Sequence, residues 1–131
     1  MKFNTALLHA GVVRENNGAT LPPVYQNSAF EQENAKDLEE IFDNKKIGYC
    51  YTRVGNPTVS AFENRITKIE GGIASIACSS GMAALMNAIL NILRSGDEII
   101  SSASLYGGTI DLFRDLEAFG IHTKYVHNNN W

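Results

Sequence analysis

The spacing of apolar residues in the second half of the chain predicts a strand followed by a helix. Ile73 to Cys78 form a short apolar run rich in isoleucine, which is typical of a strand buried on both faces. From Met82 the apolar positions recur every three or four residues, as they do on one face of a helix. Ser79 to Gly81 separate the two patterns and are predicted to form a tight turn.

Further along the chain the same alternation continues. Asp97 to Ser102 and Ile121 to Val126 are predicted to be strands, and a helix from about Thr109 to Phe119 lies between them. The resulting order is β-α-β-α-β, which predicts an α/β fold with a doubly wound, mainly parallel sheet. In such a fold the turns Ser79 to Gly81 and Tyr106 to Gly108 open onto the same edge, where ligands bind.

The first half of the chain shows weaker periodicity. Residues 1–34 are predicted to be an extended arm, because Pro22-Pro23 excludes a regular helix at that point. Ala35 to Phe42 have the spacing of a short amphipathic helix, and Asn56-Pro57 marks the start of a longer helix that ends at Gly71-Gly72. We therefore expect two parts: residues 1–56, which contact a neighbouring subunit, and residues 57–131, which begin an α/β domain.

Composition excludes several classes of function. The 131 residues are 44% hydrophobic with a net charge of −3 and no basic cluster, which argues against a nucleic-acid surface. No apolar run is long enough to cross a membrane, and the N-terminus lacks the pattern of a secretory signal, so a cytoplasmic location is expected. Cys50 and Cys78 lack metal-ligand spacing, so no metal site is predicted, and Cys78, in the apolar run, is expected to be a buried, reduced thiol.

Candidate chemistry begins at the turn before the Met82 helix. Ser80 can cap the helix, and Gly81 lets a ligand approach the backbone, so the helix start is a candidate phosphate site. The segment lacks the glycine spacing of a dinucleotide fingerprint, the Lys of a P-loop and the elbow of a serine nucleophile. The alternative is that Ser80 only caps a helix.

Two aromatic stretches add to this candidate site. In an extended backbone Tyr49, Tyr51 and Arg53 point to one side, where the guanidinium could bind a phosphate and a phenol could donate to it. Tyr106 is followed by two glycines, which leave room beside its ring for a flat ligand. The alternatives are an arginine that is only solvated and a Tyr106 ring that belongs to the core.

Four motifs in fixed order point to one family. YTRVGNPT, EGG, SSGMAA and LYGGT resemble the N-terminal part of the pyridoxal 5'-phosphate (PLP) enzymes of cysteine and methionine metabolism, the cystathionine synthase and lyase group. The resemblance extends from about Thr5 to Val126. It implies the N-terminal portion of the large domain of PLP fold type I, preceded by the extended arm.

The resemblance also implies roles for individual residues. Tyr51 and Arg53 would reach the cofactor phosphate of a neighbouring subunit, and Tyr106 would stack on the pyridine ring. Tyr51 and Tyr106 would also be the catalytic residues, because their phenols can move protons near the leaving group. The full set of cofactor-binding residues that it implies is Tyr51, Arg53, Ser80, Gly81, Met82 and Tyr106.

The reaction that the resemblance favours is the replacement of the acetyl group of O-acetylhomoserine by sulfide to give homocysteine, a step of methionine biosynthesis. Cystathionine γ-synthase, methionine γ-lyase and the cystathionine lyases remain alternatives. The γ-lyase group typically has cysteine two places after the stacking tyrosine, where this chain has Gly108, and this difference disfavours the lyase reaction. The expected assembly is a homo-oligomer of at least two subunits, and a tetramer is favoured.

In this family the lysine that forms a Schiff base with PLP lies beyond the position that matches residue 131, and none of the lysines here matches it. The chain is therefore expected to be the N-terminal portion of an enzyme and to be inactive alone. A hypothesis of another class is a truncated paralogue that acts as a binding or assembly partner.

Overall fold

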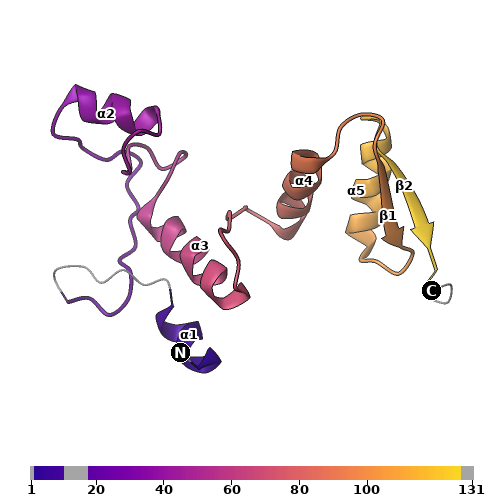
Figure 1. Cartoon of the computed structure of the whole chain (residues 1–131), viewed down its shortest axis with the longest axis horizontal. Coiled ribbons are helices and arrows are strands. Elements are labelled where there is room, and N and C mark those ends of the chain that lie inside the picture. Colours follow the sequence, from indigo (N-terminus) through magenta and orange to yellow (C-terminus); the bar gives the residue numbers. More distant parts are fainter. Residues whose placement is uncertain (1, 11–17, 128–131) are drawn as a thin grey trace. The chain divides into compact units, whose positions relative to one another are not determined.

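The computed structural model describes residues 2–10 and 18–127, and the chain forms two compact units, residues 1–77 and 78–131 (Figure 1). Part of the predicted arm, residues 11–17, and the last four residues, 128–131, lie outside the described residues. In chain order the elements are α1 (Phe3–His9), α2 (Ala35–Phe42), α3 (Pro57–Glu70), α4 (Gly81–Ile92), β1 (Glu98–Ser102), α5 (Gly107–Glu117) and β2 (His122–Val126).

The second unit is built on a parallel pair of strands. β1 and β2 pair from Glu98 opposite His122 to Ser102 opposite Val126, and α5 connects them and lies along the pair (Figure 1). A parallel pair needs such a crossover connection, so the predicted β-α-β order of this region is confirmed. Its α/β character with a parallel sheet is confirmed as well.

The core of the second unit lies between α5 and the strands. Leu116 is fully buried, and Phe113 and Ile121 are 7% and 2% exposed. Ile89 and Leu93, near the C-terminal end of α4, pack against this cluster. The core therefore holds α4 against α5, so the starts of both helices belong to the same unit.

The prediction of a strand at Ile73 to Cys78 is wrong. The segment is not in a strand, it pairs with none of the described residues, and Ile73 and Ile76 are 103% and 86% exposed. Side chains of α3 bind it instead: Thr67 Oγ1 donates to Ser75 Oγ at 2.8 Å, and the Ala77 N–H donates to Glu63 Oε1 at 2.8 Å. A strand requires a neighbouring strand for its N–H and C=O groups, and an apolar run does not specify one.

In the first unit, α3 begins and ends where the sequence predicts. Asn56 caps it by accepting the Thr58 N–H at 2.8 Å, Pro57 occupies its first position, and Gly71 ends it with a φ of +65°. The predicted extended arm is wrong for Phe3–His9, which form α1. Contacts with α3 support this short helix, and Arg65 Nε donates to Ala10 O at 3.4 Å.

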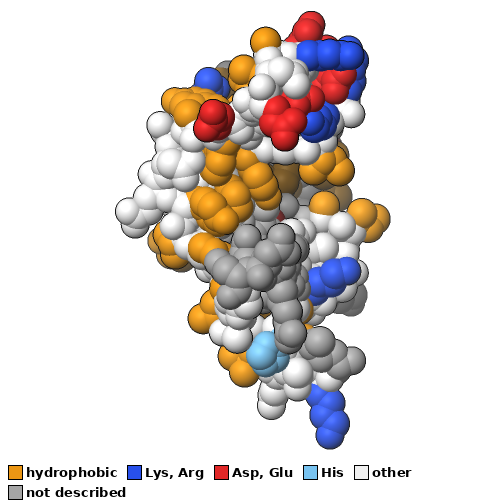
Figure 2. All heavy atoms as spheres, turned by 90° about the vertical axis from the view of Figure 1, so that its left-hand side faces the viewer, with side chains coloured by type: hydrophobic (Ala, Val, Ile, Leu, Met, Phe, Trp, Pro, Cys, Tyr) orange, Lys and Arg blue, Asp and Glu red, His pale blue; other side chains and the backbone are white. Residues whose placement is uncertain are grey.

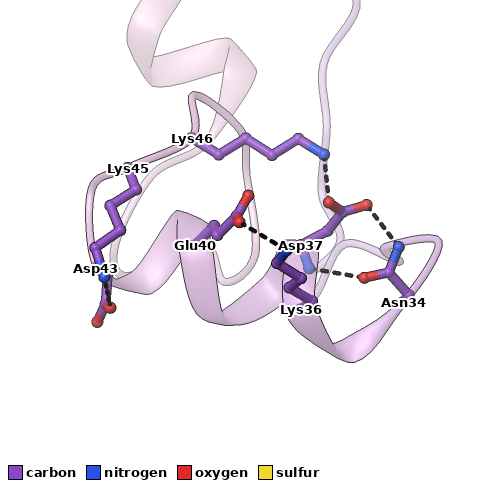
Figure 3. A network of polar contacts seen from close by, with 7 residues as sticks. All are labelled: Asn34, Lys36, Asp37, Glu40, Asp43, Lys45 and Lys46. Atoms are coloured by element: carbon purple, nitrogen blue, oxygen red, sulfur yellow. Dashed lines mark hydrogen bonds and ion pairs between the residues drawn. The ribbon is translucent and has the colours of Figure 1, made fainter.

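α2 carries the charged end of the first unit. Figure 2 shows the acidic and basic side chains gathered there, and Figure 3 shows how they pair. Lys46 Nζ lies 2.8 Å from Asp37 Oδ1, and Asn34 caps the helix through the Asp37 N–H at 2.9 Å. The hydrogen bond with the Asp37 side chain raises the pKa of Lys46 above 10.5. The pair thus stabilises the fold below the unfolded-state pKa, and its contribution is lost as the pH rises through the raised pKa.

Replacement of the most buried core side chain should destabilise the second unit. We expect Leu116→Ala to lower the free energy of unfolding by about 2–5 kcal/mol, because Leu116 is fully buried and the substitution leaves a cavity. Chemical denaturation of the native protein that contains this chain measures the change. Leu85→Ala, at a position 39% exposed in α4, is the matched control and should cost about 1 kcal/mol or less. Equal losses in the two variants would contradict this description of the core.

Candidate functional site

The start of α4 leaves polar groups open to a ligand. Ser80 is its N-cap, and its Oγ accepts the Ala83 N–H at 3.1 Å while its own hydroxyl proton can still be donated. The N–H groups of Gly81 and Met82 belong to the first turn, where no intrahelical partner exists, and no described residue accepts them. A Cβ built on Gly81 meets no atom within 4 Å, so the backbone is accessible. Two amides and the positive end of the helix dipole therefore face open space.

The start of α5 presents an aromatic ring. Tyr106 is the N-cap residue, and its carbonyl accepts the N–H of Thr109 at 2.9 Å. Its side chain is 75% exposed, so within the described structure the ring is not part of the core. A Cβ built on Gly108 would lie 2.7 Å from Tyr106 Cε1. The ring therefore lies over Gly108, in a place that only a residue without a side chain leaves free.

In the first unit, Tyr51 and Arg53 lie on a turn. Tyr51 forms an antiparallel bridge with Ala29, and its carbonyl then accepts the N–H groups of Val54 and Gly55 at 2.8 and 3.0 Å. The expectation of extended backbone through Arg53 is therefore wrong, because the chain turns after Tyr51. The two side chains are nevertheless close: the guanidinium carbon of Arg53 lies 5.5 Å from the centre of the Tyr51 ring, and both residues are exposed.

Tyr49 has a different environment from Tyr51. Its ring centre lies 5.6 Å from that of Phe30, and Cys50 between the two tyrosines is buried. Gln32 Nε2 donates to the Tyr49 carbonyl at 2.8 Å. Tyr49 thus packs against the arm and is absent from the exposed pair that Tyr51 forms with Arg53.

The expected site residues are divided between the two units. Tyr51 and Arg53 belong to the first unit, whereas the α4 start and Tyr106 belong to the second. Sequence reasoning missed Thr52, whose hydroxyl donates to the Asn27 carbonyl at 2.6 Å, and treated Asn56 only as a helix cap. The one sequence signal for Thr52 was the extended pattern, in which Thr52 points to the side opposite Tyr51. No sequence signal showed that Asn56 is buried.

The described residues show neither a metal centre nor a membrane segment. No group of three or more His, Cys, Asp or Glu residues in residues 2–10 and 18–127 could hold a metal ion. No helix among these residues has the length and apolar character needed to span a bilayer. Candidate groups for holding a ligand in the described part of the chain are the open amides at the α4 start, the exposed Tyr106 side chain and the Tyr51–Arg53 turn.

The arrangement fits a flat, phosphorylated cofactor. The free amides of Gly81 and Met82 suit a phosphate, since backbone N–H groups at a helix start bind anions. The exposed ring of Tyr106, with Gly108 beneath it, suits a planar aromatic group. Arg53 belongs to the first unit, and by itself it is an exposed cation with donors for phosphate oxygens.

Comparison with known proteins gives one consistent result. The family described as "Cys/Met metabolism PLP-dependent enzyme" matches residues 4–131. The chain is 44% identical to O-acetyl-L-homoserine sulfhydrylase of Corynebacterium glutamicum over 96% of its own length and 29% of that protein. It is 37% identical to L-methionine gamma-lyase of Fusobacterium nucleatum over 98% of its length and 33% of that protein. The chain thus spans about a third of the length of these curated relatives.

A solved structure agrees with these relatives. The crystal structure of a Campylobacter jejuni protein described as an O-acetylhomoserine (thiol)-lyase, which contains N'-pyridoxyl-lysine-5'-monophosphate, matches with a TM-score of 0.91 and 32% identity. The match covers 99% of this chain and 32% of that chain. The fold is therefore that of the N-terminal part of the large domain of the fold type I PLP enzymes. The chain belongs to the family of PLP-dependent enzymes of cysteine and methionine metabolism.

Proposed function

We propose that this chain supplies the phosphate-binding part of a PLP-dependent enzyme that replaces the acetate group of O-acetylhomoserine with sulfide, releasing acetate and forming homocysteine. The observation that carries the proposal is the open start of α4, where the N–H groups of Gly81 and Met82 lack partners among the described residues. The 44% identity to an O-acetyl-L-homoserine sulfhydrylase supports this reaction.

The chain's own residues would bind the cofactor from two sides. Gly81 and Met82 would donate their N–H groups to the phosphate, and the Ser80 hydroxyl would add a third donor. Arg53 and Tyr51 would approach the phosphate of a neighbouring subunit, which requires a homo-oligomer of at least two subunits and agrees with an expected tetramer. The exposed Tyr106 ring would lie against the pyridine ring.

PLP, when bound, withdraws electrons from the α-carbon of an amino acid and so labilises the α-proton and later the γ-substituent. Tyr106 and Tyr51 are the proposed catalytic residues of this chain. Tyr106 would orient the pyridine ring by stacking on it, and its Oη could accept or donate a proton. The Tyr51 Oη could do the same near the leaving group, with Arg53 beside its ring at 5.5 Å.

A second reaction class has its own support. The 37% identity to an L-methionine gamma-lyase favours elimination from methionine, and cystathionine γ-synthase and cystathionine lyase chemistry remain alternatives. Gly108 argues against the γ-lyase reaction, because the γ-lyase group typically has cysteine at this position. In either case we propose that residues 1–131 alone are inactive and that the protein is cytoplasmic. Cys50 and Cys78 are free thiols, but Cys78 is only partly buried, so the expectation that it is buried is wrong.

The reaction itself can be tested on the native protein that contains this chain. With PLP, O-acetylhomoserine and sulfide, we expect homocysteine and acetate to form in equal amounts, and we expect methionine to be cleaved far more slowly. Product analysis by mass spectrometry measures both. Faster cleavage of methionine would establish the lyase. An intact mass of 14.4 kDa with no activity would support the truncated, non-catalytic partner.

Removal of the proposed phosphate-binding cation should weaken cofactor binding. We expect Arg53→Ala to raise the dissociation constant of PLP about tenfold or more, because hydrogen bonds to charged groups contribute about 1.5–3 kcal/mol. Titration of the apoprotein, followed by absorbance, measures it. Arg114→Ala removes an exposed arginine that pairs with Asp111 on α5 and should leave the constant unchanged. An unchanged constant in Arg53→Ala would rule out the phosphate role.

The α4 start can be tested with two variants that both retain the cap. Asparagine and aspartate cap helices about as well as serine, so Ser80→Asn and Ser80→Asp should unfold at similar denaturant concentrations. Only Ser80→Asp places a negative charge beside the proposed phosphate. We expect it to weaken PLP binding at least tenfold more than Ser80→Asn does. Equal affinities in the two variants would mean that no anion binds at this helix start.

A further inference from the structure

Asn56 makes more hydrogen bonds than a helix cap requires. Its side chain is 3% exposed, and its Oδ1 accepts the Thr58 N–H at 2.8 Å, which is the capping bond. Its Nδ2 donates to the Tyr25 carbonyl at 3.1 Å and to Thr52 Oγ1 at 3.1 Å. These two donors face the arm and the turn, away from the helix that Asn56 caps. The side chain is therefore a junction between three segments of the first unit.

Thr52 extends this junction into the turn. Its hydroxyl accepts from Asn56 and donates to the Asn27 carbonyl at 2.6 Å, and its N–H donates to the Ser28 carbonyl at 2.8 Å. Thr52 is thus fixed through both its backbone and its side chain. Thr52 lies between Tyr51 and Arg53 in the sequence. The hydrogen bonds that hold Thr52 therefore also fix the backbone positions from which the Tyr51 and Arg53 side chains extend.

The other capping asparagine of the described residues shows what capping alone looks like. Asn34 accepts the Asp37 N–H at 2.9 Å, and its Nδ2 donates to Asp37 Oδ2 at 3.1 Å within the same helix end. Asn34 is exposed and binds no other segment through these groups (Figure 3). The side-chain N–H donors of Asn56 are therefore not needed to cap α3, and they bind the arm and the turn instead.

We propose that Asn56 is a positioning residue for cofactor binding: with Thr52, it ties the arm at Tyr25 and Asn27 to the turn so that Arg53 and Tyr51 are presented together to the phosphate. This inference rests on the proposed function. Asn56 itself does not touch the cofactor. The consequence is that the Asn56 amide and the Thr52 hydroxyl, together with the bonds that the arm makes to Thr58, couple the order of the arm to the affinity for the phosphate.

The test uses the native protein and two ligands, PLP and pyridoxal, which lacks the phosphate. Asn56→Ser keeps a capping oxygen and removes the amide donors. We expect it to raise the dissociation constant of PLP about tenfold, or about 1.4 kcal/mol, and that of pyridoxal less than about twofold. Asn34→Ser, the matched control, should change neither constant.

A double-mutant cycle separates positioning from general stability. If Asn56 positions Arg53 and Tyr51, then Asn56→Ser should cause a clearly smaller further loss of PLP affinity in an Arg53→Ala background than in the wild-type background, because only the Tyr51 contribution remains to be lost, whereas independent effects would add. Thr52→Val, at an exposed position, removes the other end of the junction and should give the same result, while Thr52→Ser keeps the hydroxyl and should restore wild-type affinity. If Asn56→Ser does not fold, the Thr52 variants decide.

The outcomes distinguish this inference from the proposed function. Unchanged PLP affinity in Arg53→Ala would overturn the phosphate role itself. If Arg53→Ala weakens PLP binding while Asn56→Ser and Thr52→Val bind PLP with wild-type affinity, only the positioning role is overturned. Equal losses for PLP and pyridoxal, or losses that add in the cycle, would show that Asn56 only stabilises the fold, and would also overturn the inference.

Discussion

A polar group that leaves water loses free energy unless it finds a hydrogen-bond partner, and this cost shapes both units of the chain. Where no neighbouring strand pairs with the backbone, side chains satisfy it: Glu63 accepts the Ala77 N–H, and Asn56 donates to the Tyr25 carbonyl. Where neither a strand nor a side chain provides a partner, the backbone N–H groups stay unpaired, as at the start of α4. Buried and open polar groups thus have opposite roles, since the first hold segments in place and the second can bind a ligand.

Local signals in the sequence predicted most of the elements because their causes are local. Helix caps at Asn56 and Ser80, the proline after Asn56 and the helical spacing of apolar residues depend on neighbours within a few positions. The strand at Ile73 to Cys78 failed for the opposite reason, since pairing depends on distant residues that periodicity does not identify. The helix Phe3–His9 was missed because packing on α3, rather than its own pattern, supports it.

The candidate site divides along the same line. The start of α4 could be foreseen from Ser80 and Gly81, because a cap and an open glycine act within one turn. Arg53 contacts the Tyr51 ring on a turn, where an extended strand was expected. The sequence thus predicted that the two side chains lie near each other, but it predicted the wrong backbone conformation. The donors of Asn56 could not be foreseen, because their acceptors lie at Tyr25 and Thr52.

The ring of Tyr106 over Gly108 bears on how this site can change during evolution. The three atoms nearest a Cβ at position 108 all belong to the exposed Tyr106 ring, which can rotate away, so the fold would tolerate a Cβ there at little cost in stability. The ring, however, would have to swing aside. One codon change could therefore move the Tyr106 ring, the proposed stacking surface for the cofactor, while the folded population stays constant. If the ring stacks as proposed, selection on cofactor binding could act at this position without first being limited by folding.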